Sequence, residues 1–222
     1  MSTSVRFVVD GFNVYHAIKE TAGRAGPDCR WLDLRSLCGA TLQLIDTSAR
    51  TEQIHYYSAL AHHLERKRPG TVARHRRYID ALEATGIAVH LGNFKPKDIR
   101  YHSDSCHVRL RRHEEKETDA AIASMIVRAA AERECDALVL LSGDTDLVPA
   151  FREARGVRGE LKLVSLFPPY RSNRAFDTCS DAHFKISPRQ LEAHQLPSVI
   201  VATDGRRIER PPEWRNATPP AA

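Results

Sequence analysis

The sequence predicts an α/β domain in which helices cover both faces of a mainly parallel β-sheet. Two features support this fold class: short apolar runs typical of buried strands, and intervening segments whose apolar residues recur three or four positions apart. The five apolar runs are residues 5–9, 54–59, 87–91, 137–141 and 161–167. Strands that alternate with helices in this way favour three layers with the sheet in the middle.

Four of the connecting segments are expected to form helices. In the segment 31–45, the apolar stripe that can face a sheet consists of Leu34, Leu37, Cys38, Thr41 and Ile45. Further helices are expected at 72–84, at 118–134 and from Asp146 onward, the last with Pro149 in its first turn and Gly156 beyond its end.

The 222 residues, 42% of them hydrophobic, suit one sizeable domain with a short extension. We place the domain at residues 1–188 and the extension at 189–222, where "VIVATDGRRIERPPEW" predicts a hairpin that offers a contact for a homo-oligomer. The five cysteines include no CxxC pair, and no run reaches the roughly 18 apolar residues of a membrane span. We therefore expect a cytoplasmic protein that has no signal peptide and does not enter a membrane.

The segment 93–117 is polar, strongly charged and long for a connection. It is expected to be a functional loop or a small irregular insert. A zinc site built from its histidines and cysteine stays open, although their spacing matches no standard ligand pattern. The residues concerned are His102, Cys106, His107 and His113.

The net charge of +5 is concentrated in two clusters, "ERKRPGTVARHRRY" and "VRLRRH". Clustered arginines are expected of a protein that binds a phosphate backbone, although a solvated helix face has a similar pattern. The candidate phosphate contacts in these clusters are Arg74, Arg76, Arg77, Arg111 and Arg112.

Carboxylates follow two of the predicted strands directly. Asp10 comes after the first strand, and Asp144 and Asp146 come after the fourth, in "SGDTD". Ligands of parallel sheets bind beyond the carboxyl ends of neighbouring strands, so the three acids would meet there if these two strands are adjacent. Asp119 joins them from the first turn of the third helix. A turn and helix caps are the alternative explanation, and Asp146 in particular can start the fourth helix.

Carboxylates that converge in one crevice repel one another unless a cation lies between them. Oxygen ligands of this kind suit Mg²⁺ or Mn²⁺, which also coordinate phosphate oxygens. The chemistry that this combination favours is metal-assisted hydrolysis at phosphorus, with a polyanion held by the basic clusters.

Three blocks, "FVVDGFNVY", "EEKETDAAIA" and "LVLLSGDTDLVPAFREAR", resemble the NYN domain, or LabA-like group, of the PIN-like nuclease superfamily. The resemblance covers about residues 5–188. It implies a three-layer domain with a five-stranded sheet in the order 3-2-1-4-5, which makes the first and fourth strands neighbours. It also implies metal-dependent cleavage of RNA, with the chain acting as an endoribonuclease.

The resemblance assigns roles to particular residues. The metal-binding acids fall on Asp10, Asp119, Asp144 and Asp146. Asn13 would reach the metal or the scissile phosphate, Ser142 would line the crevice, and substrate phosphate would lie near Arg171 and Arg174. Relatives commonly carry Gly after the Glu-Lys pair, where this chain has Glu117 as either a fifth ligand or a solvated neighbour.

Three other functions remain open. A phosphatase of the haloacid dehalogenase type also has an aspartate after its first strand, but its general acid would stand where this chain has Phe12. Some similar proteins carry a pyridine-compound monooxygenase label, although no GxGxxG motif follows a strand here. An RNA-binding protein with weak or no catalysis is the third.

Overall fold

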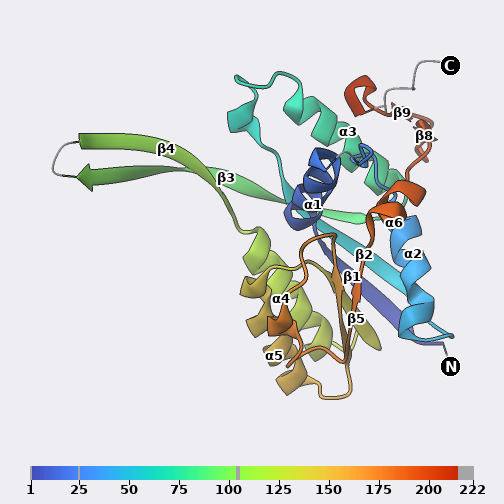
Figure 1. The fold of residues 1–222 in the computed structure, drawn as a ribbon. Coiled ribbons are helices and arrows are strands. Elements are labelled where there is room, and N and C mark those ends of the chain that lie inside the picture. The colour runs from blue at the N-terminus through green and yellow to red at the C-terminus, as the bar shows by residue number, and fades with distance from the viewer. Residues whose placement is uncertain (1, 25, 104–105, 215–222) are drawn as a thin grey trace.

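The computed structural model describes residues 2–24, 26–103 and 106–214, with the backbone alone for 98–103 and 106–116. A seven-stranded sheet forms the middle layer (Figure 1). Its strands are β1 (Ser4–Asp10), β2 (Arg50–Ala59), β3 (Ala88–Ser103), β4 (Cys106–Lys116), β5 (Ala137–Leu141), β6 (Lys162–Phe167) and β7 (Ala182–Lys185). Their order is β4-β3-β2-β1-β5-β6-β7, and all neighbours except β3 and β4 run parallel.

The predicted fold class is confirmed, because the five expected strands appear as β1, β2, β3, β5 and β6 in the order 3-2-1-4-5. β1 and β5 pair directly, with Phe7 opposite Val139 and Val9 opposite Leu141. Their carboxyl ends therefore lie side by side at one edge of the sheet, where Asp10 ends β1.

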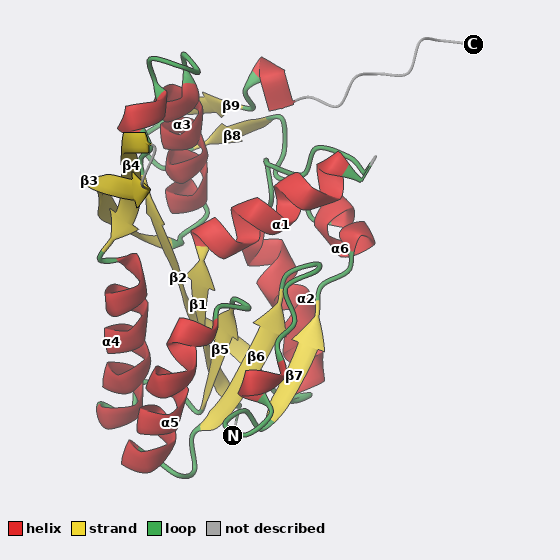
Figure 2. Ribbon diagram, turned by 60° about the vertical axis from the view of Figure 1, so that its left-hand side comes forward, coloured by secondary structure: helices red, strands yellow, loops and turns green. Residues whose placement is uncertain are grey.

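Helices cover both faces of the sheet, as Figure 2 shows. They are α1 (Gly11–Gly23), α2 (Leu34–Ile45), α3 (Thr71–Ala84), α4 (Thr118–Ala131), α5 (Val148–Val157) and the short α6 (Pro188–Ala193). Buried residues of α1, α2 and α3 share one core cluster with the sheet, and those of α4 and α5 share another. No helix in the described part of the chain is both long and apolar enough to cross a membrane.

Consecutive residues of β1 supply both cores. Phe7 and Val9 belong to the cluster under α1, α2 and α3, whereas Val8 belongs to the cluster under α4 and α5. Each side chain is fully buried, and burial of a Val or Phe side chain is worth roughly 1.5 to 3 kcal/mol. A strand with two buried faces has to be apolar at successive positions, which explains the runs in the sequence.

Helix α1 is not among the expected helices. It begins at Gly11, directly after β1, and its buried residues Val14, Ala17, Ile18 and Thr21 follow helical spacing. Gly11 is packed closely, because a Cβ atom there would lie 2.5 Å from the Tyr56 ring. The sharp change from strand to helix therefore depends on a residue without a side chain.

The expectation of an irregular insert at 93–117 is wrong. Residues 93–103 of β3 pair with residues 106–116 of β4 in a long antiparallel hairpin, which projects away from the sheet as an arm (Figure 1). The side chains of the proposed zinc ligands and of two candidate phosphate contacts lie outside the described residues: His102, Cys106, His107, His113, Arg111 and Arg112.

The chain after β6 adds β7 and α6, neither of which was expected, and then the hairpin that the sequence predicts. β8 (Val199–Val201) and β9 (Arg207–Glu209) pair antiparallel, with Gly205 at a φ of 82° in the turn. The chain beyond β9 returns to α3, where Trp214 contacts the ring of Tyr78 with centroids 6.1 Å apart. This segment therefore closes one end of the core under α3.

Candidate active site

The side chain of Asp10 is buried at the junction of β1 and α1, with only 4% of its surface exposed. It caps α1, because its Oδ1 atom accepts a 3.0 Å hydrogen bond from the backbone N–H of Asn13. Its Oδ2 atom accepts a 2.8 Å hydrogen bond from the hydroxyl of Ser142. Both carboxylate oxygens are thus held in a fixed orientation.

The loop after β5 is joined to the same junction. The Ser142 hydroxyl is fully buried and also accepts a 3.1 Å hydrogen bond from the backbone N–H of Asp144. The backbone N–H of Gly143 donates a 3.1 Å hydrogen bond to the side-chain oxygen of Asn13. These contacts bring Asp10, Asn13, Ser142 and Asp144 together, as the resemblance implies.

Asp144, not Asp146, is the capping residue of the "SGDTD" stretch. Its Oδ1 atom accepts a 3.1 Å hydrogen bond from the backbone N–H of Asp146 and so begins the 3₁₀ turn Thr145–Leu147, which leads into α5. The expectation that Asp146 starts the helix is therefore corrected. Asp146 itself is exposed.

A cleft of about 620 Å³ opens at these strand ends. Its acidic residues are Asp10, Asp119 and Asp144, and Asn13 lies beside them. Asp119 reaches the cleft from the first turn of α4, on the opposite face of the sheet from α1. Asp146 does not line this cavity.

The charges of the other two acidic residues act on Asp10. The pKa of Asp10 is raised from its ordinary 3.8 to about 6, mainly by burial, and the negative charges of Asp119 and Asp144 contribute to this rise. The hydrogen bonds from Asn13 and Ser142 act in the opposite direction and lower this pKa. Like-charge repulsion at a buried carboxylate is a cost that a cation would relieve.

The residue types fit a hard divalent cation such as Mg²⁺ or Mn²⁺, since carboxylate oxygens are the ligands that these ions prefer. The side chains do not, however, form a closed ligand cluster as they lie. Among the described residues, no group of three or more His, Cys, Asp or Glu side chains is arranged to hold one metal ion. The chemical identity of the ligands therefore supports a metal site more strongly than their spacing does.

The candidate phosphate contacts separate into three groups. Arg171 and Arg74 line the cleft, where Arg171 pairs with Glu20 at 3.3 Å and Arg74 with Glu213 at 3.0 Å. Arg76 lines a second pocket. Arg77 and Arg174 are exposed and line neither cavity.

Several residues that line the cleft were not predicted from the sequence as site residues. Tyr15, His16 and Lys19 line the cleft from α1, and Arg30 and Trp214 line it as well. The three α1 residues could have been found from the helical spacing after "DGFN". Trp214 reaches the cleft because the C-terminal segment folds back against α3, which no local pattern predicts.

Glu117 precedes α4 with a left-handed backbone, at a φ of 84°. Its carboxylate is exposed and accepts hydrogen bonds from Asn93 at 3.1 Å and from Lys95 at 3.3 Å. It therefore joins α4 to the base of the arm and does not line the cleft. Glycine adopts a left-handed φ more readily than any other residue.

Comparisons with known proteins identify the domain. A model of the NYN domain family matches residues 6–187. No curated protein matches the chain significantly. Among solved structures, VPA0982 of Vibrio parahaemolyticus, a protein of unknown function, is similar with a TM-score of 0.56 and 15% identity, over 88% of this chain and 97% of that chain.

A second similar structure is MurG of Acinetobacter baumannii, with a TM-score of 0.36 and 10% identity, over 88% of this chain and 43% of that one. This likeness is too weak to carry an argument, and the likeness to VPA0982 shows the fold alone. The family model, in contrast, spans most of the chain, including the three acidic residues of the cleft. The chain therefore belongs to the NYN domain family.

Proposed function

We propose that the chain is a ribonuclease that hydrolyses phosphodiester bonds with a divalent cation, Mg²⁺ or Mn²⁺. One observation carries the proposal: Asp10 is buried and oriented by two hydrogen bonds where Asp119 and Asp144 face the same cleft. The family supports it, because NYN domains are generally nuclease-like.

The ligands of the cation would be Asp10, Asp119 and Asp144. A divalent cation in such a site lowers the pKa of a bound water and stabilises the charge that develops on phosphate oxygens. Ser142 and the N–H of Asn13 would keep both oxygens of Asp10 in place while this charge develops. Asp146 is exposed and does not line the cleft, so the proposal gives it no ligand role.

RNA is the proposed substrate because basic side chains border the acidic residues. Arg171 and Arg74 line the same cleft as Asp10 and Asp144. A guanidinium group binds a phosphate through two hydrogen bonds, so these residues can hold the RNA backbone while the carboxylates bind the cation.

A cleavage assay with Asp144→Asn tests this proposal. Wild type and variant are incubated with structured and single-stranded RNAs in Mn²⁺, in Mg²⁺ or in EDTA. Asparagine is also a good capping residue, so the turn after β5 should survive the substitution. Asp177→Asn is the matched control, because Asp177 is exposed and does not line the cleft.

We expect wild type and Asp177→Asn to cut RNA in Mn²⁺ or Mg²⁺ but not in EDTA. Asp144→Asn should lose at least about 100-fold in rate, the scale on which a single electrostatic contact to the transition state acts, and should still bind RNA. An absence of cleavage by wild type under every metal condition would refute the nuclease proposal and leave an RNA-binding function.

A further inference from the structure

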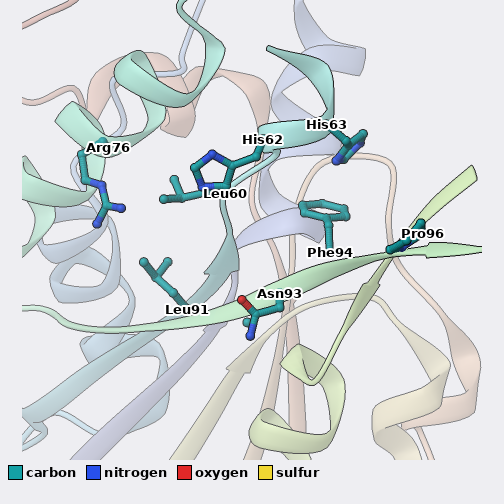
Figure 3. A pocket seen from close by; sticks show the side chains of 9 residues that line it. Leu60, His62, His63, Arg76, Leu91, Asn93, Phe94 and Pro96 are labelled. Atoms are coloured by element: carbon teal, nitrogen blue, oxygen red, sulfur yellow. The ribbon is translucent and has the colours of Figure 1, made fainter. Parts of the chain in front are cut away.

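A second pocket, of about 610 Å³, lies where β3 leaves the central sheet (Figure 3). β3 pairs with β2 as far as Gly92 and with β4 from Asn93 onward, so the pocket lies at the base of the arm. Its opposite wall comes from α3 and from the 3₁₀ turn His62–Leu64. Two separate layers of the fold therefore build it.

The lining of this pocket combines a basic end with an apolar one. Figure 3 shows Arg76 at one end, Phe94 and His63 at the other, and Leu60 and His62 between them. None of the described lining residues is acidic. Arg76 is exposed and makes no ion pair with any side chain that the structure describes. The pocket thus suits a ligand with a flat apolar part and a negative group.

The pocket adjoins the cleft of the proposed active site. His63 and Phe94 line both cavities. The Phe94 ring also meets the ring of Phe12 edge to face, with centroids 5.6 Å apart, and Phe12 lies two positions after Asp10. A ligand in the pocket and a phosphate at the carboxylates would therefore be near neighbours.

We propose that this pocket binds one nucleotide of single-stranded RNA next to the scissile bond. Its base would lie against Phe94 and Leu60, and its phosphate would contact Arg76 and His62. The inference rests on the proposed function, since it extends the substrate path of the same site. An unpaired strand is required, because bases inside a duplex are stacked on one another and cannot lie on an aromatic side chain.

Equilibrium binding in EDTA tests the pocket without cleavage. The probe is a fluorescent ten-nucleotide single-stranded RNA, and a duplex of the same sequence is measured in parallel. Arg76→Ala removes the charge, and Phe94→Leu removes the aromatic ring while keeping an apolar side chain. Arg189→Ala is the matched control, because Arg189 is exposed on α6 and lines neither cavity.

We expect each pocket variant to weaken binding of the single strand by about 5- to 10-fold, as loss of one phosphate contact or one stacking contact does. Arg76→Ala should also lower the slope of log K against log salt by about 0.7, whereas Phe94→Leu should leave the slope unchanged. Phe94→Leu should have no effect on the duplex. Arg76 is exposed, so its variant keeps the test valid if Phe94→Leu folds poorly.

Wild-type affinity in both variants, with melting temperatures that show them folded, would overturn the inference. Equal weakening of single strand and duplex by Phe94→Leu would overturn the base contact. Cleavage in Mn²⁺ is measured separately and distinguishes the two proposals. If wild type cuts RNA but the variants bind normally, the pocket proposal alone is wrong; if nothing is cut but the variants bind weakly, the nuclease proposal alone is wrong.

Discussion

The hydroxyl of Ser142 donates a 2.8 Å hydrogen bond to Oδ2 of Asp10, across 132 positions of the sequence. Ser142 is fully buried and follows β5, whereas Asp10 ends the neighbouring strand β1. The same hydroxyl accepts a hydrogen bond from the backbone N–H of Asp144. One small side chain therefore orients an acidic residue on one strand and the loop that carries another.

Ser142→Ala is expected to reduce the cleavage rate about 10-fold and to shift its pH profile upward. Loss of the hydrogen bond removes an interaction that lowers the pKa of Asp10, so its carboxylate will form only at higher pH. Stability should fall by about 1 to 2 kcal/mol, the cost of an unpaired buried group. The control is Ser165→Ala: Ser165 is a buried residue of β6, and the variant loses its 2.7 Å hydrogen bond with Ser180. An equal loss of activity in both variants would contradict a specific role for Ser142.

Asp10→Asn is expected to raise the melting temperature in EDTA at pH 8. Folding raises the pKa of Asp10 from 3.8 to about 6. The contribution of this carboxyl to the free energy of unfolding is therefore fully present below pH 3.8 and is lost as the pH rises through 6. The shift corresponds to about 2 to 3 kcal/mol, and asparagine never acquires the charge. Thermal melts from pH 4 to pH 8 should show a difference between variant and wild type that grows with pH. A constant difference would contradict this origin.

Most of the sheet could be predicted because its strands are buried on both faces. Phe7 and Val8 point into different cores, and both have to be apolar. The arm lacks this signal, because residues 93–103 and 106–116 pair beyond the central sheet and the segment 93–117 is polar. A polar segment offers no alternation of apolar and polar residues, so its strands leave no periodic pattern in the sequence.

The site could be predicted only as far as strand ends determine it. Asp10 and Asp144 follow apolar runs, and adjacency of β1 and β5 brings them together. The capping role of Asp144 could not be assigned, because either aspartate of "SGDTD" satisfies the local preference. The backbone conformation decides it, with Asp144 extended at a φ of −77° and a ψ of 122° and the turn starting at the next residue.

Glu117→Gly is expected to raise the melting temperature, although it removes two hydrogen bonds. The left-handed φ of 84° at Glu117 is unfavourable for any side chain, whereas glycine adopts it freely. The bonds to Asn93 and Lys95 lie at the surface, where such contacts contribute little. Glu117→Ala keeps the strain and loses the bonds, so it should melt below wild type. The reverse order of the two variants would show that contact with the arm outweighs the strain.

Gly143→Ala is expected to destabilise the protein by about 1 to 3 kcal/mol, the usual cost of overpacking, and to impair cleavage. A Cβ atom at this position would lie 1.8 Å from the carbonyl oxygen of Arg171, so the loop that carries Arg171, a residue of the cleft, has to shift. Gly39→Ala is the control: nothing lies within 4 Å of its Cβ position in α2, and alanine there should add up to about 1 kcal/mol. Urea unfolding measures both changes. A Gly143→Ala protein as stable and active as wild type would show that the contact between these loops is not needed for the site.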